Sequence, residues 1–258
     1  MRDAVADLFL GSRCVGCERP GRLLCPVCRT AMTRPPEQTW PDPVPDGLVE
    51  PWAAAPYEGV VRSAVLGHKE DGLWALGRPL GVLLAEAVVA GLTGLAEAPV
   101  LLVPIPSRPA VVRQRGHAPT LALSRAAGRV LRQAGVQTHV LPVLRLGAAV
   151  ADQSGLSATE RADNLAGSLW CPGGPLRRSA RRHRRGWVVL CDDVMTTGAT
   201  LREGQRALAA VGLDPVIAAV VAATRRRTQG PRPAAEGAGR PVRAGPAEFP
   251  LPPVADSG

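Results

Sequence analysis

One stretch of the chain, residues 188–201, constrains the fold more than any other. It begins as an apolar run, reaches two adjacent carboxylates at Asp192 and Asp193, and continues through a loop of small residues into a helical pattern. A buried strand that ends in polar groups and leads into a helix is the repeating unit of an open α/β sheet. Ligands bind such sheets at the carboxyl ends of the strands, so the stretch predicts a binding edge there.

The loop after the two carboxylates is suited to a phosphate group, because backbone N–H groups at a helix N-terminus favour an anion. Carboxylates in contact with a phosphate would repel it, so their expected targets are hydroxyl groups a few ångströms away. A sugar phosphate satisfies both requirements. The motif GxxxxGK[ST] is absent and no GxGxxG follows the first strand, so a surface acidic turn is the remaining alternative. The expected phosphate-binding residues are Thr196, Thr197, Gly198, Ala199 and Thr200.

Other segments continue the alternation of strands and helices, which predicts an α/β fold with a mainly parallel sheet. The apolar run 99–105, bounded by prolines, is typical of a buried parallel strand. Further strands are expected at 139–144, 187–191 and 215–223, and helices at 60–66, 79–97, 117–134 and 199–211.

Four of the six cysteines fall close together near the N-terminus, in two CxxC pairs. Thiols at this density in a chain without a secretory signal are typical of metal ligands. Four thiolates complete a tetrahedral Zn²⁺ site, which supplies folding energy that a very small module lacks. Two redox pairs or unrelated thiols are the alternative. The predicted structural zinc ligands are Cys14, Cys17, Cys25 and Cys28.

Composition divides the chain into four parts. Residues 1–32 are expected to form the zinc module, 33–51 a proline-rich linker, 52–224 the α/β domain, and 225–258 a disordered tail rich in Pro, Gly and Arg. No signal sequence or transmembrane segment is expected, since the longest apolar stretch is interrupted by Glu86 and Glu97. The protein is therefore expected to be soluble and cytoplasmic.

The formal net charge of +9 is concentrated in two segments, 177–185 and 224–258, and outside them basic and acidic residues balance. Nucleic-acid binding, if present, would depend on these local patches. The arginine run 177–185 is either a solvated loop before a strand or a contact surface for a phosphate backbone. Aromatic residues that stack on single-stranded bases are scarce, at 3% of the chain.

The stretch 188–201 closely resembles the 5-phosphoribosyl-1-pyrophosphate (PRPP) binding motif of type I phosphoribosyltransferases. Residues 10–224 as a whole resemble the ComF family of competence proteins. That wider resemblance is carried, in the family's order, by the cysteine module, 57–62, His68–Lys69 with Gly72, 103–106, Arg115–Gly116, Gln153 with Glu160–Arg161, and Asn164. One departure is that Arg115–Gly116 continues into His117, Ala118 and Pro119 where the family has an aromatic residue, Asn and Gln.

The resemblance implies a type I phosphoribosyltransferase-like sheet with a small N-terminal zinc ribbon, and a site for PRPP with Mg²⁺. It implies that Asp192 and Asp193 hold the ribose hydroxyls as catalytic residues and that the loop 196–200 holds the 5′-phosphate. Lys69, the only lysine, would otherwise be a surface residue. The implied pyrophosphate-facing residues are Ser107, Arg108, Arg113, Arg115 and Lys69, and those of a mobile closing loop are Arg145, Gln153, Arg161 and Asn164.

The function that follows from the resemblance is phosphoribosyl transfer with release of pyrophosphate. This favours an enzyme, a pentosyltransferase, although a binding motif alone leaves turnover and the acceptor open. The alternative is a non-catalytic nucleic-acid-binding factor in DNA uptake during natural competence. It would use the zinc module and the arginine run, with single-stranded DNA and the uptake machinery as partners.

Overall fold

The computed structural model describes residues 12–108, 111–113, 116–147, 167–183, 185–224 and 245–248. Its centre is a seven-stranded sheet in which the neighbours from β2 to β4 run parallel, while β1 pairs antiparallel with β2. The main strands, in spatial order, are β1 (Glu37–Gln38), β2 (Pro51–Pro56), β8 (Ile217–Ala223), β7 (Arg185–Met195), β3 (Val100–Pro104) and β4 (Thr138–Val140).

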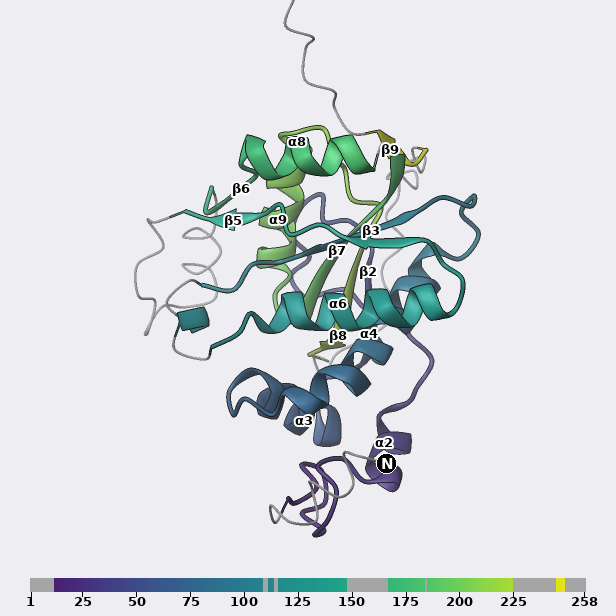
Figure 1. The fold of residues 1–258 in the computed structure, drawn as a ribbon, viewed down its shortest axis with the longest axis vertical. Helices are drawn as coiled ribbons and strands as arrows, with labels where there is room; N and C mark the ends of the chain where they lie inside the picture. Colours follow the sequence, from purple (N-terminus) through teal and green to yellow (C-terminus); the bar gives the residue numbers. More distant parts are fainter. Residues whose placement is uncertain are drawn as a thin grey trace, which may run out of the picture.

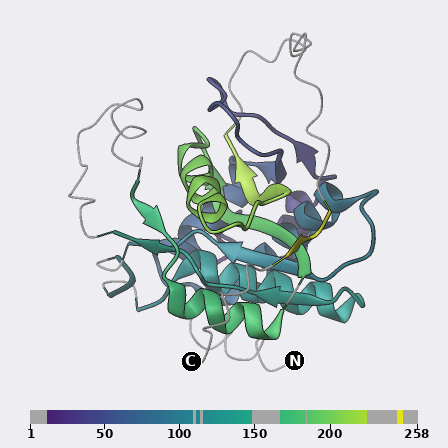
Figure 2. The same cartoon turned by 90° about the horizontal axis from the view of Figure 1, so that it is seen from above.

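Helices cover both faces of this twisted sheet, with α4 and α6 against one face and α9 against the other (Figures 1 and 2). A separate hairpin consists of β5 (Arg145–Leu146) and β6 (Leu169–Trp170). The described helices are α2 (Pro26–Met32), α3 (Gly59–Lys69), the short 3₁₀ helix η1 (Trp74–Leu76), α4 (Gly77–Leu92), α6 (Pro119–Gln133), α8 (Gly173–Arg182) and α9 (Ala199–Ala209).

The central strand β7 shows why the chain forms two cores. Val188 and Leu190 join the hydrophobic cluster on the α9 face, whereas Val189 and Cys191 join the cluster on the α4 and α6 face. All four are fully buried, as expected for a parallel strand covered on both sides. The strand extends beyond the predicted 187–191 and includes Asp192 and Asp193, so both carboxylates lie within the ladder and not after it.

The predicted helices and strands are largely confirmed, with shifted ends. The helix expected at 79–97 ends at Leu92, because Thr93 is extended and Gly94 has φ 81°. The strand expected at 139–144 is shorter, at Thr138–Val140. Within the described residues, the stretch Trp74–Leu92 is long and apolar enough to cross a membrane, but 56% of it is buried inside the protein. Its apolar character is therefore explained by packing on β2, β8 and α6.

The proline-rich segment is more ordered than a linker. It contributes β1, and residues 51–56, which lacked a predicted strand, form β2 and pair with β8 in the middle of the sheet. Prolines stand only at the ends of β2, at Pro51 and Pro56, where a missing N–H interrupts the ladder least. Gln205 of α9 clamps the connecting chain, accepting a hydrogen bond from the Val49 N–H at 2.9 Å and donating to the Gly47 carbonyl at 2.9 Å.

Two basic segments also differ from the simplest expectation. The arginine run begins in a helix, α8, in place of a loop, and its Leu176 packs against the core on the α9 face. Within the tail, Ala247–Glu248 forms β9, which pairs antiparallel with the start of β7. The tail positions 225–244 and 249–258, where disorder was expected, lie outside the described residues.

The N-terminal module packs against α3, next to which Figure 1 shows α2. Cys14, Cys25 and Cys28 are buried and continue the cluster that contains Val61 and Val65 of α3. The backbones approach closely at Gly16, where a Cβ atom would lie 2.9 Å from both the Cys28 sulfur and Val60. Helix α3 therefore links the cysteine module to the domain.

Candidate functional site

The two carboxylates near the end of β7 are held by residues from distant parts of the chain. Asp193 is buried, at 3% exposed, and its Oδ2 atom lies 2.8 Å from the Lys69 ammonium nitrogen at the end of α3. Asp192 is half-buried, and its Oδ1 accepts a long hydrogen bond of 3.5 Å from the Thr120 hydroxyl at the start of α6. The single lysine therefore pairs with the acid pair and is not merely a surface residue.

The electrostatic environment of this pair favours the protonated form of one of its two carboxyl groups. Burial and the neighbouring Asp193 carboxylate raise the pKa of Asp192 to about 8, although Lys69 opposes the shift. One ammonium group cannot neutralise two carboxylates that lie on adjacent residues. The site can therefore present one carboxylate and one carboxylic acid near neutral pH. A cation or a hydroxyl group that binds there stabilises the ionised carboxylate.

The loop after β7 forms an anion cradle at the N-terminus of α9. Gly198 has φ 73° and caps the helix, and its position is crowded because a Cβ atom would lie 3.0 Å from both Leu48 and Pro41. The Thr197 hydroxyl accepts a hydrogen bond of 3.4 Å from the Ala199 N–H, whereas Thr196 is exposed. The N–H groups of the first helical turn have no partner inside the helix and attract negative charge.

Three of the expected pyrophosphate-facing or loop residues lie around one cavity of about 500 Å³. Ser107, Arg113 and Arg145 all line it, together with the end of β3. Arg108 directly follows Ser107 in the chain, and Lys69 contacts Asp193 instead. Two guanidinium groups in one cavity suit a phosphate or pyrophosphate group. The expected residues Arg115, Gln153, Arg161 and Asn164 lie outside the described residues.

The sequence reasoning missed the residues that fix the β5–β6 hairpin, which flanks the segment 148–166. Glu203 of α9 accepts a hydrogen bond of 2.9 Å from the Leu169 N–H, and Arg206 donates to the Leu169 carbonyl at 2.8 Å. Glu203 and Arg206 also pair with each other at 2.7 Å. Their spacing of three residues on a helix is a detectable signal for an ion pair, but nothing in it indicates Leu169 as the partner.

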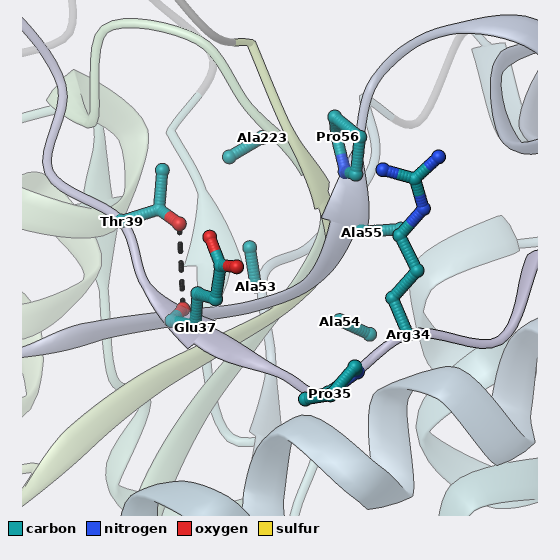
Figure 3. Close-up of a pocket in the computed structure, with 9 residues that line it drawn as sticks. All are labelled: Arg34, Pro35, Glu37, Thr39, Ala53, Ala54, Ala55, Pro56 and Ala223. Carbon is teal, nitrogen blue, oxygen red and sulfur yellow. Dashed lines mark hydrogen bonds between the residues drawn. The ribbon is translucent and has the colours of Figure 1, made fainter. Parts of the chain in front are cut away.

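Another cavity at the carboxyl edge is too small for a ligand. It measures about 20 Å³ and lies between Arg34, Glu37 and the alanines of β2 and β8, where Figure 3 shows the Thr39 hydroxyl bonded to the Glu37 carbonyl. A single water molecule needs roughly 10–15 Å³. This cavity is therefore too small to hold a substrate.

The four N-terminal thiols form a cluster with the dimensions of a metal site. Their sulfur atoms lie within 4.8 Å of one another, and those of Cys17 and Cys25 are 3.7 Å apart. Zn–S bonds of roughly 2.3 Å in a tetrahedron place sulfur atoms about 3.8 Å apart. Backbone N–H groups of Cys25 and Cys28 donate to the sulfur atoms of Cys14 and Cys25, both at 3.4 Å.

The electrostatics of this cluster also fit a divalent cation. Burial opposes ionisation of Cys14, but backbone hydrogen bonds outweigh it and lower its pKa to about 6. Burial and the neighbouring thiols raise the pKa of Cys28 to about 12. Four thiols this close cannot all ionise without a compensating charge, which a zinc ion supplies. The four cysteines can therefore hold zinc, and no coordination position remains for a substrate.

Comparison with known proteins supports the interpretation of the sheet edge as a site for a phosphoribosyl group. A family model described as the phosphoribosyl transferase domain matches residues 173–236, a range that contains α8, β7, the threonine loop, α9 and β8. No curated protein matches the chain. Residues 173–236 thus match a phosphoribosyl transferase domain, and the sheet to which they contribute is mixed, with mostly parallel strands flanked by helices. The four clustered cysteines lie N-terminal to it.

Proposed function

We propose that the protein is a ComF-like phosphoribosyltransferase that binds PRPP with Mg²⁺ at the carboxyl edge of the sheet. The observation that carries this proposal is the pairing of Lys69 with Asp193 at 2.8 Å, beside the loop 196–200 at the N-terminus of α9. A hydroxyl-binding acid pair next to an anion cradle matches the two ends of a ribose 5-phosphate. The matched phosphoribosyl transferase family model covers both features.

Each part of the site has a separate role in this proposal. Asp192 and Asp193 hold the two ribose hydroxyls, and the loop residues Thr196 to Thr200 hold the 5′-phosphate. Arg113 and Arg145 attract the pyrophosphate. The carboxylate oxygens of the acid pair are ligands that suit Mg²⁺, and the ion, when bound with PRPP, would supply neutralising charge for the leaving group.

The reaction breaks the bond between C1′ and a pyrophosphate oxygen and forms a bond from C1′ to a nucleophilic atom of the acceptor. Pyrophosphate leaves with its electron pair, and the acceptor's proton passes to solvent. Positive charge develops at C1′, as it does in glycosyl transfer generally, and the nearby carboxylates stabilise it. Closure of the segment 148–166, with Gln153, Arg161 and Asn164, would exclude water from this intermediate.

Calorimetric titration of PRPP with Mg²⁺ tests the proposal. The wild type should bind saturably, and the double variant Asp192→Asn with Asp193→Asn should lose binding because it removes the charge of the acid pair and amides cannot replace its oxygen acceptors. Asp214→Asn, which changes an exposed carboxylate just before β8, is the matched control and should bind as the wild type does. Undiminished binding by a folded double variant contradicts the proposal. Pyrophosphate release with candidate acceptors then measures turnover.

Two further assignments belong to the same proposal: a structural Zn²⁺ bound by the four cysteines, and a cytoplasmic location. We also propose the division into domains: residues 1–32 form the zinc module, 52–224 the catalytic domain and 225–258 the tail. The proline-rich segment 33–51 connects the first two while adding β1 to the sheet.

A second candidate function is single-stranded DNA binding in DNA uptake, and one observation favours it. Helix α8 and the start of β7 expose Arg177, Arg178, Arg182 and Arg185. Binding through these side chains releases counterions and weakens steeply with salt. Affinity for an oligonucleotide between 50 and 200 mM salt, compared between wild type and a variant with these four arginines changed to Gln, tests it. Absent or salt-independent binding overturns this candidate.

A further inference from the structure

A second cavity, of about 500 Å³, lies between the end of α3, η1, α4 and α6. Figure 1 shows α3 and α4 close together on this side of the molecule. Neither residue of the acid pair lines the cavity, and neither do their contacts Lys69 and Thr120. Small-molecule sites usually enclose roughly 300–1,000 Å³. The cavity is therefore large enough for a ligand of its own, apart from the carboxyl edge of the sheet.

Aromatic rings form one side of this cavity. The ring of His117 lies edge-on to that of His68, with centroids 5.4 Å apart, and its centroid is 5.9 Å from that of the Trp74 indole. Trp74 is 64% exposed, which is unusual for so large an apolar side chain. An exposed indole beside a cavity offers a flat face on which a planar ligand stacks.

His68 brings unused hydrogen-bonding groups to the cavity. Its side chain is 2% exposed, and neither Nδ1 nor Nε2 makes a hydrogen bond within the described part of the chain. Burial and the neighbouring His117 lower the pKa of His68, so the ring is neutral near pH 7. A neutral imidazole offers one donor and one acceptor. Because a buried polar group without a partner is costly, a ligand that supplies both partners gains affinity.

Close packing of α3, α4 and α6 fixes the walls of the cavity. The His68 ring lies against the start of α4, where a Cβ atom on Gly77 would be 3.1 Å from Cε1 of the imidazole. Further along α4, a Cβ atom on Gly81 would clash with Ala126 of α6. Helices that approach this closely have little freedom to shift, so the cavity is formed before a ligand binds.

The charges around the cavity select an anion. Arg78 of α4 and Arg129 of α6 both line it and are exposed, and among its described lining residues none is acidic. Helix α6 contains no acidic residue at all. Two guanidinium groups from different helices favour a phosphate, because its oxygens can accept hydrogen bonds from both. The lining residues thus combine a stacking surface, a donor and an acceptor, and a phosphate-binding pair.

We propose that this cavity binds a nucleoside monophosphate, separately from the PRPP site proposed at the acid pair. The base stacks on Trp74, and its edge, which carries donors and acceptors, hydrogen-bonds to His68. The phosphate pairs with Arg78 and Arg129. This inference goes beyond phosphoribosyl transfer, because a nucleotide already carries a ribose phosphate on its base. It is therefore a second ligand and not an acceptor for the transfer.

Calorimetric titration of AMP, GMP, CMP and UMP into the full-length, zinc-loaded protein tests the proposal. At least one nucleotide should bind saturably without PRPP or Mg²⁺, and the corresponding nucleoside, which lacks the phosphate, should bind about tenfold more weakly. Trp74→Ala and Arg129→Gln should each weaken nucleotide binding about tenfold. Arg125→Gln changes an exposed arginine one turn earlier on α6, outside the cavity, and this matched control should bind as the wild type does.

Two further measurements separate this site from the acid pair. The double variant Asp192→Asn with Asp193→Asn should bind the nucleotide as tightly as the wild type, and saturating PRPP with Mg²⁺ should not displace it. Loss of nucleotide binding in the folded double variant, or displacement by PRPP, would mean that the two ligands share one site, and it would overturn the proposal.

Three other results would also overturn it: no nucleotide binding at all, equal binding of nucleotide and nucleoside, or wild-type affinity in both Trp74→Ala and Arg129→Gln. Because both side chains are exposed, neither substitution is expected to unfold the protein, and urea unfolding checks this. The titrations without PRPP do not depend on phosphoribosyl transfer, so the proposed function can fail while the nucleotide site stands.

Discussion

The cysteine module and the carboxyl edge of the sheet both gather polar atoms into a small volume, but they do so by different means. The module takes its four thiols from residues 14–28, and their sulfur atoms lie within 4.8 Å of one another. The sheet edge takes Lys69, Thr120 and Asp193 from three different helices and strands. The first arrangement depends on local turns, and the second depends on the whole core being assembled.

This difference teaches that the two regions are stabilised by different forces. In the module, the hydrophobic contribution is small and the bound metal is expected to supply the folding energy. At the sheet edge, fully buried side chains such as Val188, Leu190 and Val220 fix the strands, and the polar residues are positioned as a result. Helix α3 contacts both regions, so it is the place where one could influence the other.

The largest expected effect follows from removing a metal ligand. Cys28→Ser should reduce the zinc content from one per chain to near zero and unfold the module. The reason is that structural zinc contributes roughly 10–16 kcal/mol of binding free energy in zinc-finger peptides. PRPP affinity should be retained because the sheet has its own core. Atomic emission gives the zinc content, and calorimetry the affinity.

Cys171→Ser, a half-buried thiol outside the cluster, is the control and should keep its zinc. Loss of PRPP binding in Cys28→Ser but not in Cys171→Ser would contradict the view that the two regions are stabilised independently. It would show that the module supports the site through α3.

A smaller effect is expected from Gly198→Ala. The residue has φ 73°, and the new Cβ would lie 3.0 Å from Leu48 and Pro41. Left-handed backbone costs roughly 1–2 kcal/mol for a residue with a Cβ, and the crowding adds to that cost. Urea unfolding should show a loss of about 2–3 kcal/mol, and calorimetry should show weaker PRPP binding.

Gly94→Ala separates the two contributions, because Gly94 has φ 81° but no atom within 4 Å of the added Cβ. It should lose only the backbone part and bind PRPP normally. Equal losses in the two variants would mean that contact with the proline-rich segment does not fix the loop.

The smallest expected effect is a dependence on pH. The pKa of Asp192 rises from 3.8 to about 8 on folding, so the folded state binds more protons than the unfolded state between these values. Stability from this group is therefore fully present below about pH 4 and is lost as pH rises towards 8. Because Asp192 is half-buried, the loss is expected to be only about 1–2 kcal/mol.

Urea unfolding of the wild type and Asp192→Asn between pH 4 and 8 measures this pH-dependent loss of stability. The variant should become more stable relative to the wild type as pH rises. Asp214→Asn, which is exposed, should follow the wild type. A constant difference between the wild type and Asp192→Asn across this range would contradict the raised pKa.

Local patterns predicted much of this protein. The alternation of apolar residues with helical stretches predicted β3, β7, β8, α3, α6 and α9, and the small-residue loop predicted the start of α9 at Ala199. They failed for β2, because prolines in the segment outweighed the short apolar run from Trp52 to Ala55. They also failed for α8, because an arginine-rich sequence without acids gives no signal of the apolar contact that Leu176 makes.

The groups that the sequence alone predicted are local ones. The four thiols of the CxxC pairs lie within one short segment, and the adjacent carboxylates lie within a few residues of the threonine loop. Three contacts follow from the folded arrangement alone: Lys69 pairs with Asp193, Glu203 holds Leu169, and an exposed indole and a buried imidazole share a cavity. The physical reason is the range of the forces. Turns and helix starts depend on neighbouring residues, whereas these contacts depend on how two hydrophobic cores bring distant helices against one sheet.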